Sequence, residues 1–240
     1  MRRVRGKGNN ALLSSISFSS SFFIRSDNSG LEAVILLAAI RDLTNLTSLS
    51  IRQTRVSTAS LCETVGRLVK LEELDISQCF EQFGRGHRMM VEATLRSLRH
   101  LRTLNISYNN ILSSDACLPM QLQLHSLDIS SNWLAGGLWI VNTEGTPALV
   151  SFAEALKTLT SLKTLNLSKN RLDAKISTLA PALRCLTNLE TLDLSYNNLG
   201  ADLPPIPGAC TDVPHQLEDA RSTSATIPTC TRWHCLSQTW

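Results

Sequence analysis

Leucine and isoleucine recur at fixed offsets in six short stretches spread over most of the chain. Each stretch follows the frame L-x-x-L-x-L-x-x-N, whose positions we number 1 to 9, with isoleucine in place of leucine at position 6 in four copies. The copies begin at Leu46, Leu71, Leu101, Leu124, Leu162 and Leu189. Successive starts are 25, 30, 23, 38 and 27 residues apart. Six matching copies at such a period predict a chain built by stacking one structural unit.

The alternation inside the frame predicts a short strand. Successive side chains of a strand point to opposite faces. Positions 4 and 6 therefore point into the core, while positions 3, 5, 7 and 8 line the exposed face of the strand. Stacked copies then form a parallel ribbon in which each repeat buries its leucines against its neighbours. The asparagine at position 9 leaves the strand, where its amide can satisfy backbone groups of the turn. Thr54 and Cys79 replace this asparagine in the first two copies.

Apolar residues also recur 10, 6 and 3 positions before the frame, which predicts a helix in five of the six repeats. Steps of four and three residues place these side chains on one helix face. The sets are Leu36, Ile40 and Leu43; Leu61, Val65 and Leu68; Val91, Leu95 and Leu98; Phe152, Leu156 and Leu159; and Leu179, Leu183 and Leu186. The interval before Leu124 differs, because Pro119 and Gln121 occupy the helical segment. We expect a short irregular crossing there.

One helix and one strand per repeat, seen best in LAPALRCLTNLETLDLSYNNL, resemble the ribonuclease-inhibitor-like subclass of leucine-rich repeats. The resemblance covers residues 30–203. It implies an α/β fold: a right-handed β–α solenoid, or horseshoe, of about six repeats, with a parallel sheet on the concave face and helices on the convex face. Members that bind ribonuclease carry more cysteines and an acidic face, so ribonuclease inhibition is not implied.

The two ends of the chain lack the frame. Residues 1–29 are basic and serine-rich, which indicates either a targeting segment or a disordered tail. Residues 204–240 contain prolines and cysteines, and we expect them to be disordered. Five side chains of this tail could be drawn as a zinc cluster, namely Cys210, His215, Cys230, His234 and Cys235. Their spacings match no familiar zinc motif, so we predict no metal site.

Composition and charge narrow the function classes. The 240 residues carry a formal net charge of +3, which is too small and too scattered to indicate nucleic-acid binding. No stretch approaches the roughly 18 apolar residues of a membrane-spanning helix.

Cysteine usage bears on the compartment. Seven cysteines, an odd number, do not suggest a disulfide framework. We interpret Cys62, Cys79 and Cys185 as small buried side chains. The cytoplasm, a reducing compartment, is the expected location, unless residues 1–26 are a cleaved signal for an organelle or for secretion. We also expect a monomer.

No catalytic or cofactor-binding motif occurs in the sequence. It contains no nucleophile elbow, phosphate-binding loop, glycine-rich dinucleotide turn or HExxH pair. We therefore predict a non-enzymatic protein, without a cofactor, that acts as a scaffold and binds a protein partner. Two alternatives remain open. One is a regulatory or substrate-recognition arm of a GTPase-activating or ubiquitin-ligase system, and the other is an extracellular recognition protein.

Two surfaces are candidates for the partner. The first is the concave face of the strand ribbon, which is polar, mildly acidic and contains tyrosine, a residue type favoured in interfaces. Its candidate residues are Asp75, Tyr108, Asp128, Lys169, Asp193 and Tyr196. The second is the 133–148 loop, where Trp133 and Trp139 have no place in the frame. Each set has a structural alternative: the tyrosines can be common fillers of the repeat, and the tryptophans can pack over the flank of the solenoid.

Overall fold

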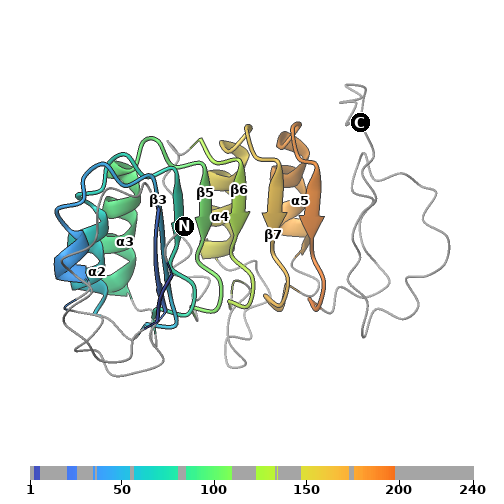
Figure 1. Cartoon of the computed structure of the whole chain (residues 1–240). Coiled ribbons are helices and arrows are strands. Elements are labelled where there is room, and N and C mark those ends of the chain that lie inside the picture. Colours follow the sequence, from blue (N-terminus) through green and yellow to red (C-terminus); the bar gives the residue numbers. More distant parts are fainter. Residues whose placement is uncertain are drawn as a thin grey trace.

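The structure of the 240-residue chain is a computed structural model, shown in Figure 1. It describes residues 3–5, 21–25, 35, 37–54, 57–80, 85–109, 123–132, 134, 147–172 and 176–197. For residues 3–5, 21–25, 85–88 and 147–148 only the backbone is described. All six frames fall within these ranges, so the structure tests the predicted strands and most of the predicted helices.

The described strands form one parallel sheet whose order follows the sequence. Its members are β1 (Arg3–Arg5), β2 (Ser21–Arg25), β3 (Ser48–Arg52), β4 (Glu73–Asp75), β5 (Thr103–Asn105), β6 (Ser126–Asp128), β7 (Thr164–Asn166) and β8 (Thr191–Asp193). From β3 to β8 the register aligns equivalent frame positions, so that Leu49 pairs with Leu74 and the pattern continues to Leu165 and Leu192. Each predicted frame therefore forms one strand.

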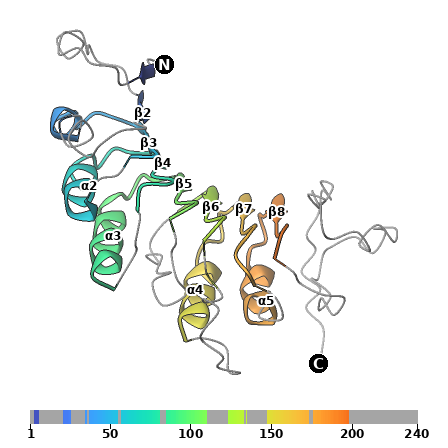
Figure 2. The same ribbon diagram turned by 90° about the horizontal axis from the view of Figure 1, so that it is seen from below.

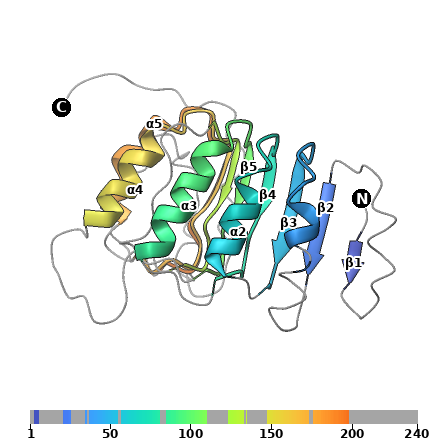
Figure 3. The ribbon, with the colours of Figure 1, turned by 90° about the vertical axis from the view of Figure 1, so that its left-hand side faces the viewer.

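Helices cover one face of this sheet. They are α2 (Thr58–Val65), α3 (Arg85–Ser97), α4 (Pro147–Lys157) and α5 (Ile176–Cys185), and a helical turn at 37–40 precedes them. Viewed along the strands, the sheet curves and the helices lie on its outer, convex side (Figure 2). The side view in Figure 3 shows the same two layers. The predicted arc, with strands inside and helices outside, is confirmed.

The core lies between the two layers and consists mainly of leucine. The frame leucines at position 4 are at most 3% exposed in all six repeats. Facing them, the predicted apolar stripes of α2, α3, α4 and α5 are buried, including Leu61, Leu95, Phe152 and Leu183. Each repeat can bury these side chains only against its neighbours, which makes stacking the source of stability.

A ladder of buried asparagines runs through the turns that follow the strands. Asn109, Asn132, Asn170 and Asn197 are at most 2% exposed. Each accepts through Oδ1 a hydrogen bond from the backbone N–H of position 9 in the preceding repeat, over 2.8–3.2 Å. Each amide nitrogen donates to the position 6 carbonyls of its own and the preceding repeat. The predicted role of the asparagine is confirmed.

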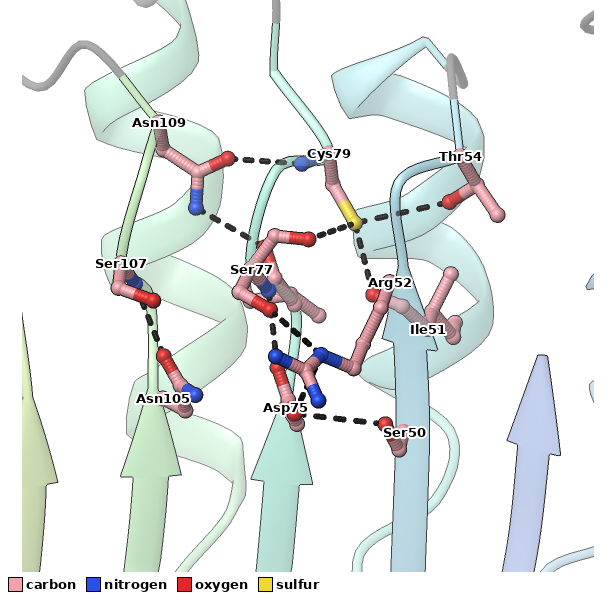
Figure 4. A network of polar contacts seen from close by, with 11 residues as sticks. Ser50, Ile51, Arg52, Thr54, Asp75, Ser77, Cys79, Asn105, Ser107 and Asn109 are labelled. Carbon is pink, nitrogen blue, oxygen red and sulfur yellow. Dashed lines mark hydrogen bonds and ion pairs between the residues drawn. The ribbon is translucent and has the colours of Figure 1, made fainter. Parts of the chain in front are cut away.

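In the first two repeats the ladder changes its chemistry. Cys79 is 2% exposed, and its thiol donates to the Ile51 carbonyl over 2.8 Å, the bond that an asparagine amide makes in later repeats. Thr54 lies 3.5 Å from the same sulfur (Figure 4). Cys79 and Cys62 are buried as predicted, but Cys185 is exposed. The prediction for Cys185 was wrong because this residue ends α5 on the solvent side of the helix.

The sheet extends into the segment 1–29, for which we expected disorder or targeting. β2 pairs in parallel with β3, with Phe22 opposite Leu49 and Ile24 opposite Ile51, and β1 pairs with β2. The boundary of the repeats at residue 30 thus leaves two strands on its other side. The crossing around Pro119 and the segment 204–240, with its zinc alternative, lie outside the described residues.

Candidate functional site

Position 5 of the frame ends each strand from β4 to β8 with a side-chain hydrogen bond. In five consecutive repeats the Oδ1 atom of an Asp or Asn accepts the backbone N–H two residues later, over 2.9–3.0 Å. The acceptors are Asp75, Asn105, Asp128, Asn166 and Asp193. Figure 4 shows the bond that the backbone N–H of Ser107 donates to Asn105. This local bond replaces the next rung of a strand and turns the chain out of the sheet.

That turn buries position 7, which we had predicted to lie on the exposed, concave face of the strands. Ser77, Ser107, Ser130 and Ser168 are only 3–7% exposed. The prediction was wrong for these serines because strict alternation ends at position 5, where the Asx bond begins. The concave surface is therefore formed by positions 3, 5 and 8, together with the exposed Arg52 and the partly exposed Ser195 at position 7.

Position 8 has an unusual backbone conformation in every repeat. The residues Gln53, Gln78, Tyr108, Ser131, Lys169 and Tyr196 have φ between +53° and +58°, the left-handed region that non-glycine residues rarely adopt. We call these six residues the strand-end row. Their backbone N–H groups donate to carbonyls of the next repeat where the bonds are described, as from Tyr108 to Ser130 over 3.0 Å. Neighbouring repeats thus hold the strained conformation and the direction of each side chain.

Three members of the strand-end row form a cluster at the C-terminal ends of β5, β7 and β8. The ammonium nitrogen of Lys169 lies 6.0 Å from the ring centroid of Tyr108 and 5.2 Å from that of Tyr196. These distances allow a cation–π attraction to both rings. Tyr108 and Tyr196 are 47% and 55% exposed. Three of the predicted site residues, distant in sequence, are therefore brought together in one tyrosine–lysine cluster.

The surroundings of Tyr108 lower the pKa of its phenol. The neighbouring Ser131 hydroxyl contributes most, followed by the positive charge of Lys169. The Ser131 oxygen makes no hydrogen bond of good geometry with a described residue, so the Lys169 charge is the firmer of these two causes. The Asp128 carboxylate acts in the opposite direction. The cluster therefore brings lysine, tyrosine and aspartate into electrostatic contact across three strands.

The predicted site residue Asp75 belongs to a separate network at the other end of the ribbon (Figure 4). Its Oδ2 atom lies 3.4 Å from Nε of Arg52 and accepts a hydrogen bond from Ser50 over 3.4 Å. Arg52 also donates to the Ser77 hydroxyl over 3.1 Å. The charge of Asp75 is thus paired within the protein. By contrast, Asp128 and Asp193 form no ion pair with another described residue.

Sequence reasoning missed the pairing of Arg52 and the backbone of the strand-end row. Arg52 occupies position 7, where the other repeats have serine, and this departure was the available signal. Gln, Tyr, Ser and Lys are not residue types that indicate a left-handed backbone, so no sequence signal predicted the conformation of the strand-end row. Trp133 and Trp139 lie outside the described residues, as does most of the 133–148 loop.

The described residues contain no group of three His, Cys, Asp or Glu side chains placed to hold a metal ion. The cysteine closest to the network, Cys79, is buried, and burial raises the pKa of its thiol to about 11. A thiol that stays protonated near neutral pH is a poor nucleophile and a poor metal ligand. Cys79 is therefore a structural residue of the ladder.

Two regions of the sequence match known families. Residues 160–208 match the family described as Leucine Rich repeats (2 copies), and residues 97–115 match the one described as Leucine Rich repeat. Both regions coincide with the frames and with the asparagine ladder. This is a leucine-rich-repeat protein. Repeats of this kind generally serve as protein-binding scaffolds, because stacking produces an extended concave surface. No catalytic family is among the matches.

Solved structures similar to this leucine-rich-repeat protein include the tropomodulin C-terminal domain of Caenorhabditis elegans. It has 12% identity and a TM-score of 0.39, over 70% of this chain and 83% of that one. An internalin from Listeria monocytogenes has 14% identity and a TM-score of 0.31, over 66% of this chain and 56% of the internalin. No curated protein matches the sequence.

In the part of the chain that the structure describes, no helix has the length and apolar character needed to cross a membrane.

Proposed function

We propose that this leucine-rich-repeat protein is a non-enzymatic scaffold that binds a protein partner at the tyrosine–lysine cluster on the concave side. The observation that carries this proposal is the position of Lys169 between two exposed tyrosine rings, 6.0 and 5.2 Å from their centroids. Tyrosine rings bury a large area with little loss of side-chain freedom, and their hydroxyls can bond to a partner. The cluster combines these rings with a fixed positive charge.

The surface around the cluster suits a protein partner of mixed polarity. Positions 3 and 5 supply Thr164, Thr191, Asp128 and Asp193, all partly exposed on the neighbouring strands. The two carboxylates have no cationic partner among the described residues, so a partner can supply one. Backbone hydrogen bonds between repeats fix these positions, which lowers the entropy cost of binding.

The described cysteines bear on the location of the protein. Cys62, Cys79 and Cys185, the described cysteines, are all free. Free thiols persist in reducing compartments, so we propose the cytoplasm. An extracellular role would instead require a cleaved signal within residues 1–26, and mass spectrometry of the N-terminus of the mature protein distinguishes the two.

Affinity capture from cell extract with mass spectrometry tests the binding surface. The intact protein is compared with three folded variants: Tyr108→Ala/Tyr196→Ala, Trp133→Ala/Trp139→Ala, and the control Met89→Ala/Val150→Ala. Met89 and Val150 are 69% and 43% exposed and belong to α3 and α4, so the control also removes two exposed apolar side chains. We expect the tyrosine variant to lose a partner that the control retains.

The affinity of the purified partner gives the size of the effect. An interface tyrosine contributes on the order of 2 kcal/mol, so the double tyrosine variant should bind at least about a hundredfold more weakly. Loss of the partner only with the tryptophan variant would place the interface in the 133–148 loop. If none of the variants loses a partner, the tyrosines are fillers of the repeat and the proposed surface is wrong.

A further inference from the structure

A second charged surface lies at the opposite ends of the strands, where each helix has ended and the next strand begins. Four cationic side chains are exposed there, in the turns that precede β4 and β5: Arg67, Lys70, Arg99 and Arg102. We call these four residues the basic edge. The exposed His100 lies between Arg99 and Arg102. None of these residues belongs to the tyrosine–lysine cluster.

Contacts between the two turns make the basic edge one continuous surface. The backbone N–H of Arg102 donates to the Glu72 carbonyl over 2.7 Å. The Ser97 hydroxyl donates to the Gly66 carbonyl over 3.4 Å. Equivalent positions of the two repeats therefore lie side by side, with Lys70 beside His100. Neighbouring parallel strands are about 4.8 Å apart, so the four cations occupy a compact area.

The positive charge of this edge is largely uncompensated. Arg67, Arg99 and Arg102 form no ion pair with any described residue, and Lys70 donates only to the amide oxygen of Asn45, over 2.7 Å. The edge also carries Glu72 and Glu73, and Glu73 accepts a bond from Ser48 over 2.8 Å. Four cations against two carboxylates leave a net positive surface.

Stabilisation of helix ends accounts at most for Arg67, which directly follows Gly66, the C-cap of α2. Cations in the last turn of a helix interact favourably with its dipole, and Arg96 occupies that place in α3. The last turn of α2 has no basic residue. Lys70, Arg99 and Arg102 follow the helices, in the turns and at the start of the next strand, where the dipole effect fades.

An apolar side chain lies in the middle of the basic edge. Val69 is 47% exposed, and in the repeat its position is equivalent to that of Arg99. An apolar side chain of a partner can pack on this exposed valine and exclude water from it, while the surrounding cations form a charged rim. This combination of an apolar centre and a polar rim is the common design of a protein interface.

We propose that the basic edge binds an acidic segment of a protein partner, with an apolar residue of that segment resting on Val69. A second copy of this chain is unsuited, because its own basic edge would repel and its net charge is also positive, at +3. Nucleic acid is unsuited because nonspecific strands need a longer basic track and aromatic side chains for stacking. The exposed aromatic residues of the described part, Tyr108 and Tyr196, lie at the other edge.

Fluorescence polarisation with short labelled peptides tests this proposal on the full-length protein. The probes are an acidic heptapeptide with a central leucine, EEELEEE, the same peptide with central glycine, and a single-stranded oligonucleotide of equal charge. The test variant is Lys70→Gln/Arg99→Gln/Arg102→Gln. The control is Arg96→Gln/Lys157→Gln/Arg184→Gln, which removes the same charge from exposed or partly exposed cations of α3, α4 and α5. Circular dichroism confirms that both variants fold.

The expected results separate a specific surface from general charge attraction. The leucine peptide should bind the intact protein and the control equally, and the test variant about tenfold more weakly, since three contacts of roughly 0.5 kcal/mol each are lost. Added salt should weaken binding. A further variant, Val69→Ser, should remove the preference for leucine over glycine.

Three outcomes would overturn the proposal. One is equal binding of the test variant and the control, and another is tighter binding of the oligonucleotide than of the leucine peptide. The third is a leucine preference that survives in Val69→Ser, since it would show that the apolar contact lies elsewhere.

Discussion

At the scale of single residues, the asparagine ladder shows how one side chain can serve two repeats. The Asn170 amide nitrogen donates to the Ile129 and Leu167 carbonyls over 3.0 Å each, and its Oδ1 atom accepts from the Asn132 backbone over 3.2 Å. These groups are buried, so water cannot replace a missing partner. Asn170 therefore links its own repeat to the preceding one through buried hydrogen bonds.

Replacing Asn170 by alanine should lower the free energy of unfolding by about 2–4 kcal/mol, because buried carbonyl and N–H groups lose their partners. Urea denaturation followed by circular dichroism measures the change. Asn188→Ala is a suitable comparison, because Asn188 is exposed and its amide donates to the Thr160 carbonyl at the surface. Equal losses in the two variants would contradict a special role of the ladder.

Cys79 should make the stability sensitive to alkaline pH. Burial raises the pKa of its thiol from 9.0 to about 11 in the folded protein. In the unfolded chain the thiol ionises first, so the stabilisation is complete below pH 9 and is lost as the pH rises towards 11. At pH 10.5 the loss should amount to roughly 2 kcal/mol.

Urea midpoints at pH 8 and pH 10.5 measure this effect against Cys79→Ser. Serine can keep the hydrogen bond to Ile51 but does not ionise in this range, and tyrosine and lysine titrate equally in both proteins. Parallel pH profiles of the two proteins would show that Cys79 does not ionise on unfolding.

At this scale the sequence predicted the side chains whose positions follow the regular alternation of a strand. It did not predict those placed by turns after the strand. The frame predicted that the position 9 asparagine bonds to the backbone of the turn, because an amide at the same place after each strand can satisfy groups that the turn leaves unpaired. It did not predict that Ser77 and its equivalents are buried, since the Asx bond from Asp75 acts after the alternating pattern ends. The grouping of Tyr108, Lys169 and Tyr196 followed from one shared frame position, but the distances depend on backbone angles that no residue type signals.

At the scale of elements, helices depend on packing and on local start signals. α2 begins after Ser57, whose side chain accepts a bond from the Ser60 backbone over 3.1 Å. The step pattern of apolar residues predicted α2, α3, α4 and α5, because each has a clear buried face. It could not predict β2, because in the sequence Ser19 stands where the frame has its first leucine, and Phe22 and Ile24 replace the other two.

Phe152 in α4 should be far more important for stability than its helical neighbour Val150. Phe152 is fully buried, and replacing it by alanine should cost about 3–5 kcal/mol through lost contacts and a cavity. Val150 is 43% exposed, so Val150→Ala should change the stability by no more than about 0.5 kcal/mol. Thermal and urea unfolding of both variants measure the difference. Comparable losses would show that α4 does not pack on the sheet as described.

At the scale of the whole molecule, the strand pairings and the ladder bonds of the described residues join neighbouring repeats. The sheet order follows the sequence, and the ladder bonds link each repeat to the one before it. A solenoid of this kind has two exposed ends, each of which needs protection. β1 and β2 extend the sheet beyond the first recognisable frame and so cover the edge of β3.

Removing residues 1–26 should therefore destabilise the protein and promote self-association, because β3 becomes an open edge. Analytical ultracentrifugation and urea unfolding measure the two effects. Ile24→Pro should act in the same direction, since proline removes a backbone donor from a strand paired on both sides, whereas Ile24→Val should have little effect. A shortened chain that stays monomeric and equally stable would favour the interpretation of this segment as a targeting signal.

The strand-end row has a consequence for how such a molecule can change over evolutionary time. One residue per repeat is exposed or partly exposed there, while its backbone is held by hydrogen bonds that do not involve its side chain. Glutamine, tyrosine, serine and lysine already occupy these six places in one fold. Substitutions in the strand-end row can therefore change the exposed side chains of the concave surface with little effect on folding. A library randomised at these six positions would yield new binding specificities on an unchanged scaffold.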